Sequence, residues 1–133
     1  MKAYVTGTGA LTAIGKNAEE TWHNMLQGNH GIRRLESIDP EHFRTKIGGE
    51  LPFDILEVGS EILPDIKIKN LILSTQMAMI AAKMALDDAD LIQDDTEMSR
   101  IGICMGSGLG GIIFAEDGMK KIMSTHPYYK SQG

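Results

Sequence analysis

The chain has 133 residues, of which 42% are hydrophobic and 5% aromatic, and its formal net charge is −5. This length suits one domain, and the acidic balance with scattered basic residues argues against a nucleic-acid-binding protein. Residues 71–86, the longest apolar region, are too short and too polar to cross a membrane. No secretory signal is expected because an apolar strand pattern follows Lys2 directly. A single cysteine cannot form an internal disulfide, so a cytoplasmic protein is expected.

The first elements are a strand over residues 3–6, ended by Gly7 and Gly9, and a helix over residues 18–27. Asn17 suits the N-cap of this helix, Glu20 completes a capping box, and Gly28 ends it. Trp22 is expected to anchor the helix to the core. The Gly7-x-Gly9-x-x-Thr12 spacing is reminiscent of a dinucleotide-binding turn, but threonine occupies the third glycine position and the helix starts too late. A structural turn is therefore favoured there.

The middle of the chain carries weaker signals. Residues 29–44 are predicted to be irregular with a turn at Asp39-Pro40, and residues 45–51 to form a strand. Residues 52–67 contain Pro52, Gly59 and Pro64 and are predicted to be a long loop with at most one helical turn. Such a loop is unusual inside a compact domain, so it is expected to cover a surface or contact a partner.

A long helix is predicted over residues 71–89, with Asn70 as its cap. It is apolar on nearly every side, which predicts burial on every side. Three acidic residues at its C-terminal end, Asp87, Asp88 and Asp90, are interpreted as solvated surface.

The last elements are a strand over residues 101–106, a glycine turn over residues 106–111 and a helix over residues 111–124. Neither face of the strand is polar, so both faces are expected to be covered. The turn, Gly106-Ser-Gly-Leu-Gly-Gly111, has four glycines in six positions after its strand. That pattern fits either a ligand or tight strand–helix packing, and both remain open.

No catalytic group emerges from these residues. Cys104 lies mid-strand, where a buried and inert thiol is expected. Ser107 lacks the framing of a nucleophile elbow. The four histidines show no metal-ligand spacing and are interpreted as surface residues: His23, His30, His42 and His126.

Several motifs in order along the chain resemble β-ketoacyl-acyl carrier protein synthases, especially the KAS II type. They begin with Val5-Thr-Gly-Thr-Gly-Ala-Leu-Thr-Ala-Ile-Gly15 and continue with the Glu19-Glu-Thr-Trp and Thr45-Lys-Ile-Gly-Gly49 stretches. The best match is Arg100-Ile-Gly-Ile-x-x-Gly-Ser-Gly-Leu-Gly-Gly111, and His126-Pro-Tyr-Tyr129 is similar to the family's Pro-Phe-Phe stretch.

The resemblance implies an α/β chain: residues 1–133 as a partial, incomplete N-terminal half of a thiolase-like αβαβα fold. It implies decarboxylative Claisen condensation of an acyl thioester with malonyl-acyl carrier protein, in fatty acid biosynthesis. The family's nucleophilic cysteine and two histidines match no residue here, so the chain is expected to be inactive alone. Leu109, with its neighbours Gly108 and Ser107, resembles the family's acyl-chain position. No cofactor or metal is expected.

The expected partners are acyl carrier protein and either a second copy or a complementary chain that covers the apolar surface. The sequence leaves two other functions open. One is a non-catalytic half that binds a complementary chain or acyl carrier protein, and the other is a small dinucleotide-binding protein.

Overall fold

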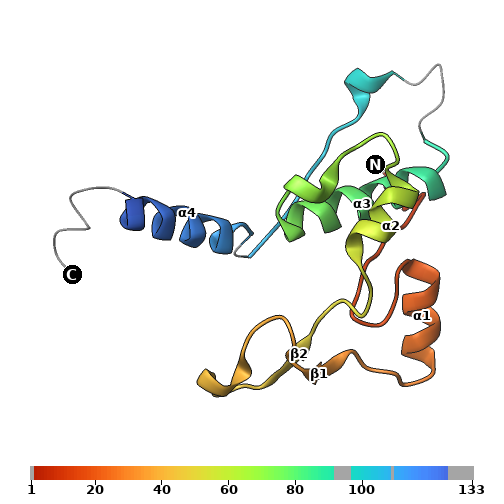
Figure 1. Ribbon diagram of the computed structural model, residues 1–133. Coiled ribbons are helices and arrows are strands. Elements are labelled where there is room, and N and C mark those ends of the chain that lie inside the picture. Colours follow the sequence, from red (N-terminus) through yellow and green to blue (C-terminus); the bar gives the residue numbers. More distant parts are fainter. Residues whose placement is uncertain (1, 92–96, 109, 126–133) are drawn as a thin grey trace.

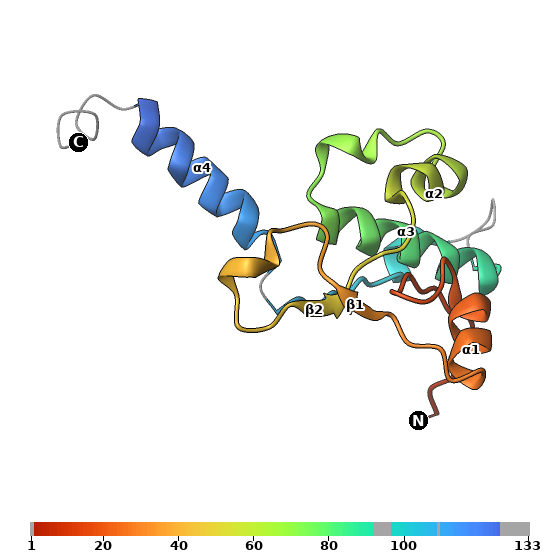
Figure 2. The ribbon, with the colours of Figure 1, turned by 60° about the horizontal axis from the view of Figure 1, so that its bottom comes forward.

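The computed structural model describes residues 2–91, 97–108 and 110–125, and Figure 1 shows how they are arranged. Helices α2 and α3 lie side by side, the hairpin of β1 and β2 lies below them, and α4 projects away (Figures 1 and 2). The helices and strands in these ranges are α1 (Ala18–Leu26), β1 (Ile32–Arg34), β2 (Ile47–Gly49), α2 (Ile55–Ile62), α3 (Leu73–Asp88) and α4 (Ile112–Thr125). Short 3-10 turns occupy Pro40–His42, Ile68–Asn70 and Met98–Arg100.

The core lies between α2 and α3. Ile80 of α3 is fully buried, and it clusters with Val58, Leu63, Ile68 and Leu11. Gly59 makes the close approach possible, because a Cβ there would lie 2.2 Å from Cδ1 of Ile68. Burial of these side chains is what holds the two helices together.

Helix α2 corrects the prediction of a loop over residues 52–67. Asp54 caps it, with its Oδ1 accepting a 2.8 Å hydrogen bond from the Leu56 N–H. In the sequence, Gly59 and Pro64 suggest that a helix cannot continue here. In the structure, Gly59 lies within α2 and packs against Ile68, and Pro64 follows the end of the helix. The expectation of a covering loop is therefore wrong for residues 55–62.

The N-terminal segment packs on α3 rather than in a sheet. Residues 3–6 have no strand partner in the part of the chain that the structure describes, and Tyr4 and Val5 are largely exposed, which corrects the predicted strand. A Cβ on Gly9 would lie 2.0 Å from the Ala81 carbonyl oxygen, so only glycine fits against the helix backbone there. The Thr8 N–H and Oγ1 both donate to the Asp88 carboxylate, at 2.7 and 3.2 Å.

Local signals define α1 as predicted. The Asn17 side chain accepts a 2.8 Å hydrogen bond from the Glu20 N–H, and Glu20 accepts one from the Lys16 N–H. Gly28 has φ +74°, the left-handed conformation expected after a helix. The prediction that Trp22 anchors the core is wrong, because its side chain is 60% exposed and α1 has no buried residue.

An antiparallel hairpin pairs Ile32–Arg34 with Ile47–Gly49. The centre of the predicted strand over residues 45–51 is confirmed as β2, whereas β1 falls in a stretch predicted to be irregular. Glu41 pairs with Lys46 and Arg34, and these two cations hold the pKa of the Glu41 carboxyl below its usual value. Glu50 accepts hydrogen bonds from the backbone N–H groups of Glu36 and Ser37, and contacts with Ser37 and Glu36 lower its pKa.

Helix α3 is present, but its cap and its burial differ from the prediction. Asn70 lies in a 3-10 turn, and the N-cap residue is Ile72, which makes no side-chain cap bond. Of its residues only Gln76 and Ile80 are buried, and Leu73 is 54% exposed. Met77, Met79 and Met84 are partly buried against the core, so α3 is covered on some sides and not on every side.

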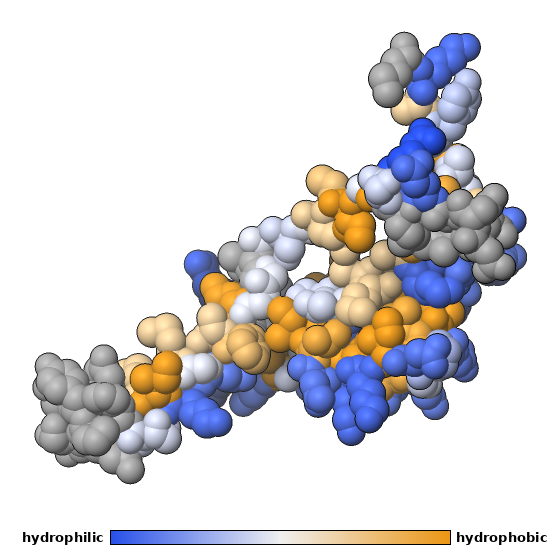
Figure 3. Space-filling model, turned by 90° about the horizontal axis from the view of Figure 1, so that it is seen from above, coloured by the Kyte–Doolittle hydropathy of each residue, from blue (hydrophilic) through white to orange (hydrophobic). Residues whose placement is uncertain are grey.

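The C-terminal arm, residues 101–108 and 110–125, is the most open part of the molecule. Residues 101–107 pair with no strand among residues 2–91, 97–108 and 110–125, and Ile103 is 85% exposed, so the predicted covered strand is not found there. Helix α4 is confirmed, with its apolar residues Met119, Ile122 and Met123 exposed. Figure 3 shows apolar side chains gathered across the middle of the molecule and again on α4.

Candidate functional site

The glycine turn joins the extended segment of the arm to α4. Gly111 has φ +80°, and Cδ1 of Ile72 lies 3.2 Å from the position a Cβ there would take. The Ser107 Oγ accepts a 2.9 Å hydrogen bond from the Gly110 N–H, which closes the turn. Added Cβ atoms on Gly106 or Gly108 would meet nothing within 4 Å. Packing against Ile72 therefore explains the glycine at position 111. It does not explain the glycines at positions 106 and 108.

A groove of about 690 Å³ runs between α3 and the extended segment, and we call it the α3 groove. None of its lining side chains titrates: Ile72, Ser74, Thr75, Met77, Ala78, Met79, Ala82, Ile103, Met105, Gly106, Ser107 and Gly110. A second groove of about 620 Å³ shares Ile72, Ser74, Met77 and Gly110 with it and continues along α4 to Phe114 and Asp117. The two form one mainly apolar surface on both sides of the turn.

The walls of the α3 groove suit binding rather than proton transfer, and Asp117, the acidic side chain of the wider surface, lines the second groove. General acid–base work requires a titratable side chain within hydrogen-bond reach of the reacting group, and the α3 groove has none. The Ser107 hydroxyl already serves as an acceptor within the turn. Walls of this kind accommodate an apolar ligand.

The predicted substrate-binding residues have different outcomes. Ser107 lines the α3 groove, Gly108 lies in the turn beside it, and Leu109 lies outside the described residues. The opposite wall, which comes from Ile72, Ser74 and Met77 of the α3 region, was not predicted. The sequence feature that could have predicted this wall is the apolar character of the helix on every side.

The remaining candidates are surface residues or lie outside the described part. Cys104 is exposed, which corrects the expectation of a buried thiol, and it does not line the α3 groove. His23, His30 and His42 are exposed as predicted, and His126 lies outside the described residues. Within the described ranges, no group of histidine, cysteine and acidic side chains could hold a metal ion.

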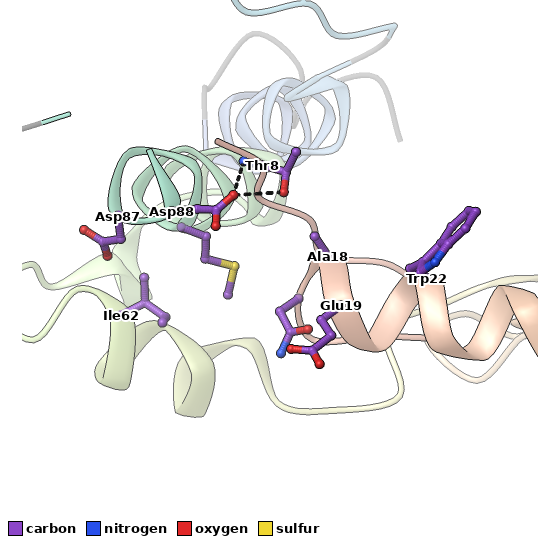
Figure 4. Close-up of a pocket in the computed structure, with 9 residues that line it drawn as sticks. Thr8, Ala18, Glu19, Trp22, Ile62, Asp87 and Asp88 are labelled. Carbon is purple, nitrogen blue, oxygen red and sulfur yellow. Dashed lines mark hydrogen bonds between the residues drawn. The ribbon is translucent and has the colours of Figure 1, made fainter. Parts of the chain in front are cut away.

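A further pocket lies between α1 and the end of α3 (Figure 4). Its volume is about 620 Å³, and Thr8, Glu19, Trp22, Asp87 and Asp88 are among its lining residues. Two of the acidic groups have structural roles, because Asp88 accepts hydrogen bonds from Thr8 and Asp87 pairs with Lys83. The interpretation of these acids as solvated surface is thus incomplete for Asp88.

The first glycine motif is a packing motif. A Cβ on Gly7 would lie 2.2 Å from the Ala85 carbonyl oxygen, so the turn approaches α3 and not the N-terminus of α1. Thr12 pairs with Gly15 and exchanges a hydrogen bond with the Thr21 hydroxyl. These contacts favour the structural turn over a dinucleotide site.

Over residues 2–131 the chain matches the family described as beta-ketoacyl synthase, N-terminal domain. It belongs to that family. It is 34% identical over 126 residues to a 3-oxoacyl-[acyl-carrier-protein] synthase 2 of Staphylococcus aureus (strain N315), covering 95% of this chain and 30% of the relative. It is 32% identical over 127 residues to the protein of the same name from Vibrio harveyi, covering 95% of this chain and 30% of that relative. The chain thus spans about 30% of the length of these relatives.

Among solved structures, the chain is similar to the ishigamide ketosynthase/chain length factor. The TM-score is 0.58 at 30% identity, with 68% of this chain and 22% of that chain covered. This likeness and the mixed helix and strand content confirm the predicted α/β class, as the N-terminal part of a thiolase-like fold. Among the described residues, no helix combines the length and apolar character that a membrane crossing requires.

Proposed function

We propose that this chain forms the N-terminal part of a 3-oxoacyl-acyl carrier protein synthase II-like condensing enzyme, with residues 1–133 as a partial half of its fold. The observation that carries the proposal is the apolar α3 groove beside Ser107 and Gly108, at the glycine turn of this family's N-terminal domain. In this proposal the groove forms a wall for the acyl chain of the thioester substrate. Acyl carrier protein delivers that substrate.

The chain supplies binding and not the chemical step. Decarboxylative condensation needs a nucleophilic thiolate and donors for the developing oxyanion. The α3 groove contains no titratable group, and Cys104 lies outside its walls. We therefore propose that the nucleophilic cysteine and the two histidines come from outside residues 1–133, and that the chain alone does not turn over.

The exposed apolar surface supports a complementary chain as the partner. Burial is worth about 25 cal/mol for each Å² of apolar surface, and Ile103, Phe114 and Met119 of the arm are all more than half exposed. A polypeptide that completes the fold, or a second copy of this chain, would cover them. The name of the solved relative gives a ketosynthase together with a chain length factor.

The test is reconstitution. The 133-residue chain is mixed with the portion of the Staphylococcus aureus relative that follows the region aligned here, and condensation is assayed with acyl carrier protein thioesters of several chain lengths. We expect no product from the chain alone and product from the mixture. Product from the chain alone, or a mixture that neither associates nor reacts, would contradict the proposal.

A groove variant connects the reconstituted activity to the proposed site. Met77→Trp fills the α3 groove and is expected to reduce activity most with long acyl chains, because Met77 lines both grooves. Met25→Trp makes the same change on α1, at an exposed side chain outside the grooves, and serves as the matched control. Equal effects of the two variants at every chain length would remove the acyl-chain assignment.

The second candidate function is a non-catalytic half that binds a complementary chain or acyl carrier protein. The absence of titratable side chains from the α3 groove is compatible with it. The same mixing experiment separates the two functions, because this alternative predicts a stable complex that forms no condensation product.

A further inference from the structure

Gln76 is the one polar side chain that is buried among the described residues, with 7% of its surface exposed. Its Nε2 donates two hydrogen bonds, to the Leu71 carbonyl at 2.8 Å and to the Ile68 carbonyl at 3.1 Å. An amide nitrogen has two hydrogens, so its donor capacity is fully used. Both acceptors belong to the short connection that precedes α3.

Within the described ranges, no other side-chain hydrogen bond supports this connection at its junction with the helix. Ile72 occupies the N-cap position and cannot accept from the first helical N–H groups, as Ser, Thr, Asp or Asn would. The Ile72 carbonyl accepts hydrogen bonds from the backbone N–H groups of Thr75 and Gln76. The Gln76 side chain binds the carbonyl of the preceding residue, Leu71. Ile68 is held in the core by its own buried side chain, and Gln76, from the first turn of α3, ties the carbonyls of Ile68 and Leu71 to the helix.

The position of Ile72 matters because Ile72 stands between the two grooves and lines both. Its Cδ1 lies 3.2 Å from the place a Cβ on Gly111 would take, so it also abuts the glycine turn. A shift of the backbone at Leu71 moves this side chain, and with it the wall shared by the grooves and its contact with the turn.

We propose that Gln76 is a positioning residue for the apolar surface at the glycine turn, acting through Leu71 and Ile72. Its two hydrogen bonds set where Ile72 meets Gly111 and hence the shape of the α3 groove. The proposal rests on the proposed function only in naming an acyl chain as what the groove receives. Gln76 touches no reacting group.

The first test measures the contact itself in the full 133-residue chain. Gln76→Met keeps the length of the side chain and removes the amide, and Gln76→Glu keeps its shape and removes the donor nitrogen. We expect both to abolish the nuclear Overhauser effect between the Ile72 δ1 methyl and the Gly111 α protons. Gln27→Met makes the same chemical change at the end of α1, and Asn17→Ala removes a cap there, and both should retain the effect.

The outcomes are decisive for the positioning role. Retention of the Ile72–Gly111 effect in Gln76→Met and Gln76→Glu would overturn the proposal. Its equal loss in Asn17→Ala would also overturn it, because any loss of stability would then suffice. Global unfolding of both Gln76 variants, seen by circular dichroism, would overturn it as well, since Gln76 would then support the whole fold.

A second readout separates this proposal from the proposed function. Binding of fluorophore-labelled dodecanoic acid is measured for the same variants, and we expect weaker binding for Gln76→Met than for Gln27→Met. Failure of the unmodified chain to bind the probe would count against an acyl site in this chain while the Overhauser experiment still decides the role of Gln76. Binding unchanged in a Gln76 variant that has lost the Ile72–Gly111 contact would show that Ile72 does not shape the site.

Discussion

The α2–α3 core and the C-terminal arm are both apolar, yet they differ in how their apolar residues are used. Ile80 in the core is fully buried, whereas Ile103 in the arm is 85% exposed. Figures 1 and 2 show the same contrast, with α2 against α3 and α4 away from both. The core therefore buries its apolar side chains against other parts of the chain, whereas the described residues leave Ile103, Phe114 and Met119 of the arm largely uncovered.

The N-terminal segment belongs with the core in this comparison. Gly7 and Gly9 allow it to lie directly on the α3 backbone, and Thr8 is hydrogen-bonded to Asp88 at the end of that helix. Its contacts join parts of the chain that are far apart in sequence. The arm lies next to the α3 region along the two grooves, where Ile72 and Met77 line the walls opposite it.

The strongest test of the contrast compares two isoleucines. Ile80→Ala should lower the free energy of unfolding by about 2–5 kcal/mol, because it leaves a cavity in a closed core. Ile122→Ala should change it by no more than about 0.5 kcal/mol, since Ile122 is 59% exposed on α4. Urea titration followed by circular dichroism measures both, and similar costs would show that the arm is as well packed as the core.

Two glycines provide the next test. Gly9→Ala should lower the free energy of unfolding by about 1–3 kcal/mol, because its Cβ would lie 2.0 Å from a backbone oxygen of α3 that cannot turn away. Gly102→Ala is the control in the arm, where an added Cβ meets nothing within 4 Å. The same titration applies, and a Gly9→Ala protein as stable as Gly102→Ala would mean that the N-terminal segment is not held on α3.

The elements that the sequence predicts well are those specified by local signals. Asn17 and Gly28 mark the ends of α1, and the apolar stripe of α4 has helical spacing whether or not it is covered. The sequence does not predict α2, because glycine has a low helix propensity and Gly59 therefore suggests that a helix ends there. In the structure, glycine is required at this position because Ile68 packs against it. Packing between distant elements is not encoded in a local pattern.

The predicted strands and the candidate site also depend on contacts between distant elements, which local sequence patterns do not encode. Residues 3–6 and 101–106 have strand-like composition, but a strand also needs a hydrogen-bonding neighbour, which the described residues do not provide. The glycine turn, including Ser107 and Gly108, was located from sequence. Its opposite wall at Ile72 and Met77 was not, because which helix faces the turn is decided by the tertiary fold.

Capping offers a smaller test, in which sequence and structure predict different results. Asn17→Ala should cost about 1 kcal/mol, because it removes the acceptor for the Glu20 N–H at the start of α1. Asn70→Ala should stay within about 0.5 kcal/mol, because the N-cap of α3 is Ile72 and not Asn70. Urea titration of both variants checks this. An equal loss for Asn70→Ala would restore Asn70 as the cap that the sequence predicts.

The smallest effects concern pH, and they should differ between the hairpin and the arm. Lys46 and Arg34 lower the pKa of Glu41 below its usual 4.5, so the stabilisation is complete above that pH and is lost as the pH falls through the lowered value. Glu116 raises the pKa of Lys120 above its usual 10.5, so its contribution to α4 is complete below that pH and is lost as the pH rises through the raised value.

Carbon chemical shifts, which stay observable at alkaline pH where amide protons exchange too fast, measure both effects in one series from acid to alkaline pH. We expect the hairpin shifts to change below pH 4.5 and the α4 shifts to change above pH 10.5, each by a small amount because the groups are exposed. Glu41→Gln should remove the change that depends on Glu41 and leave α4 as it was, and Glu116→Gln should do the reverse. Hairpin and α4 shifts that moved together in either variant would mean that the arm is coupled to the hairpin, contrary to their separation in Figure 1.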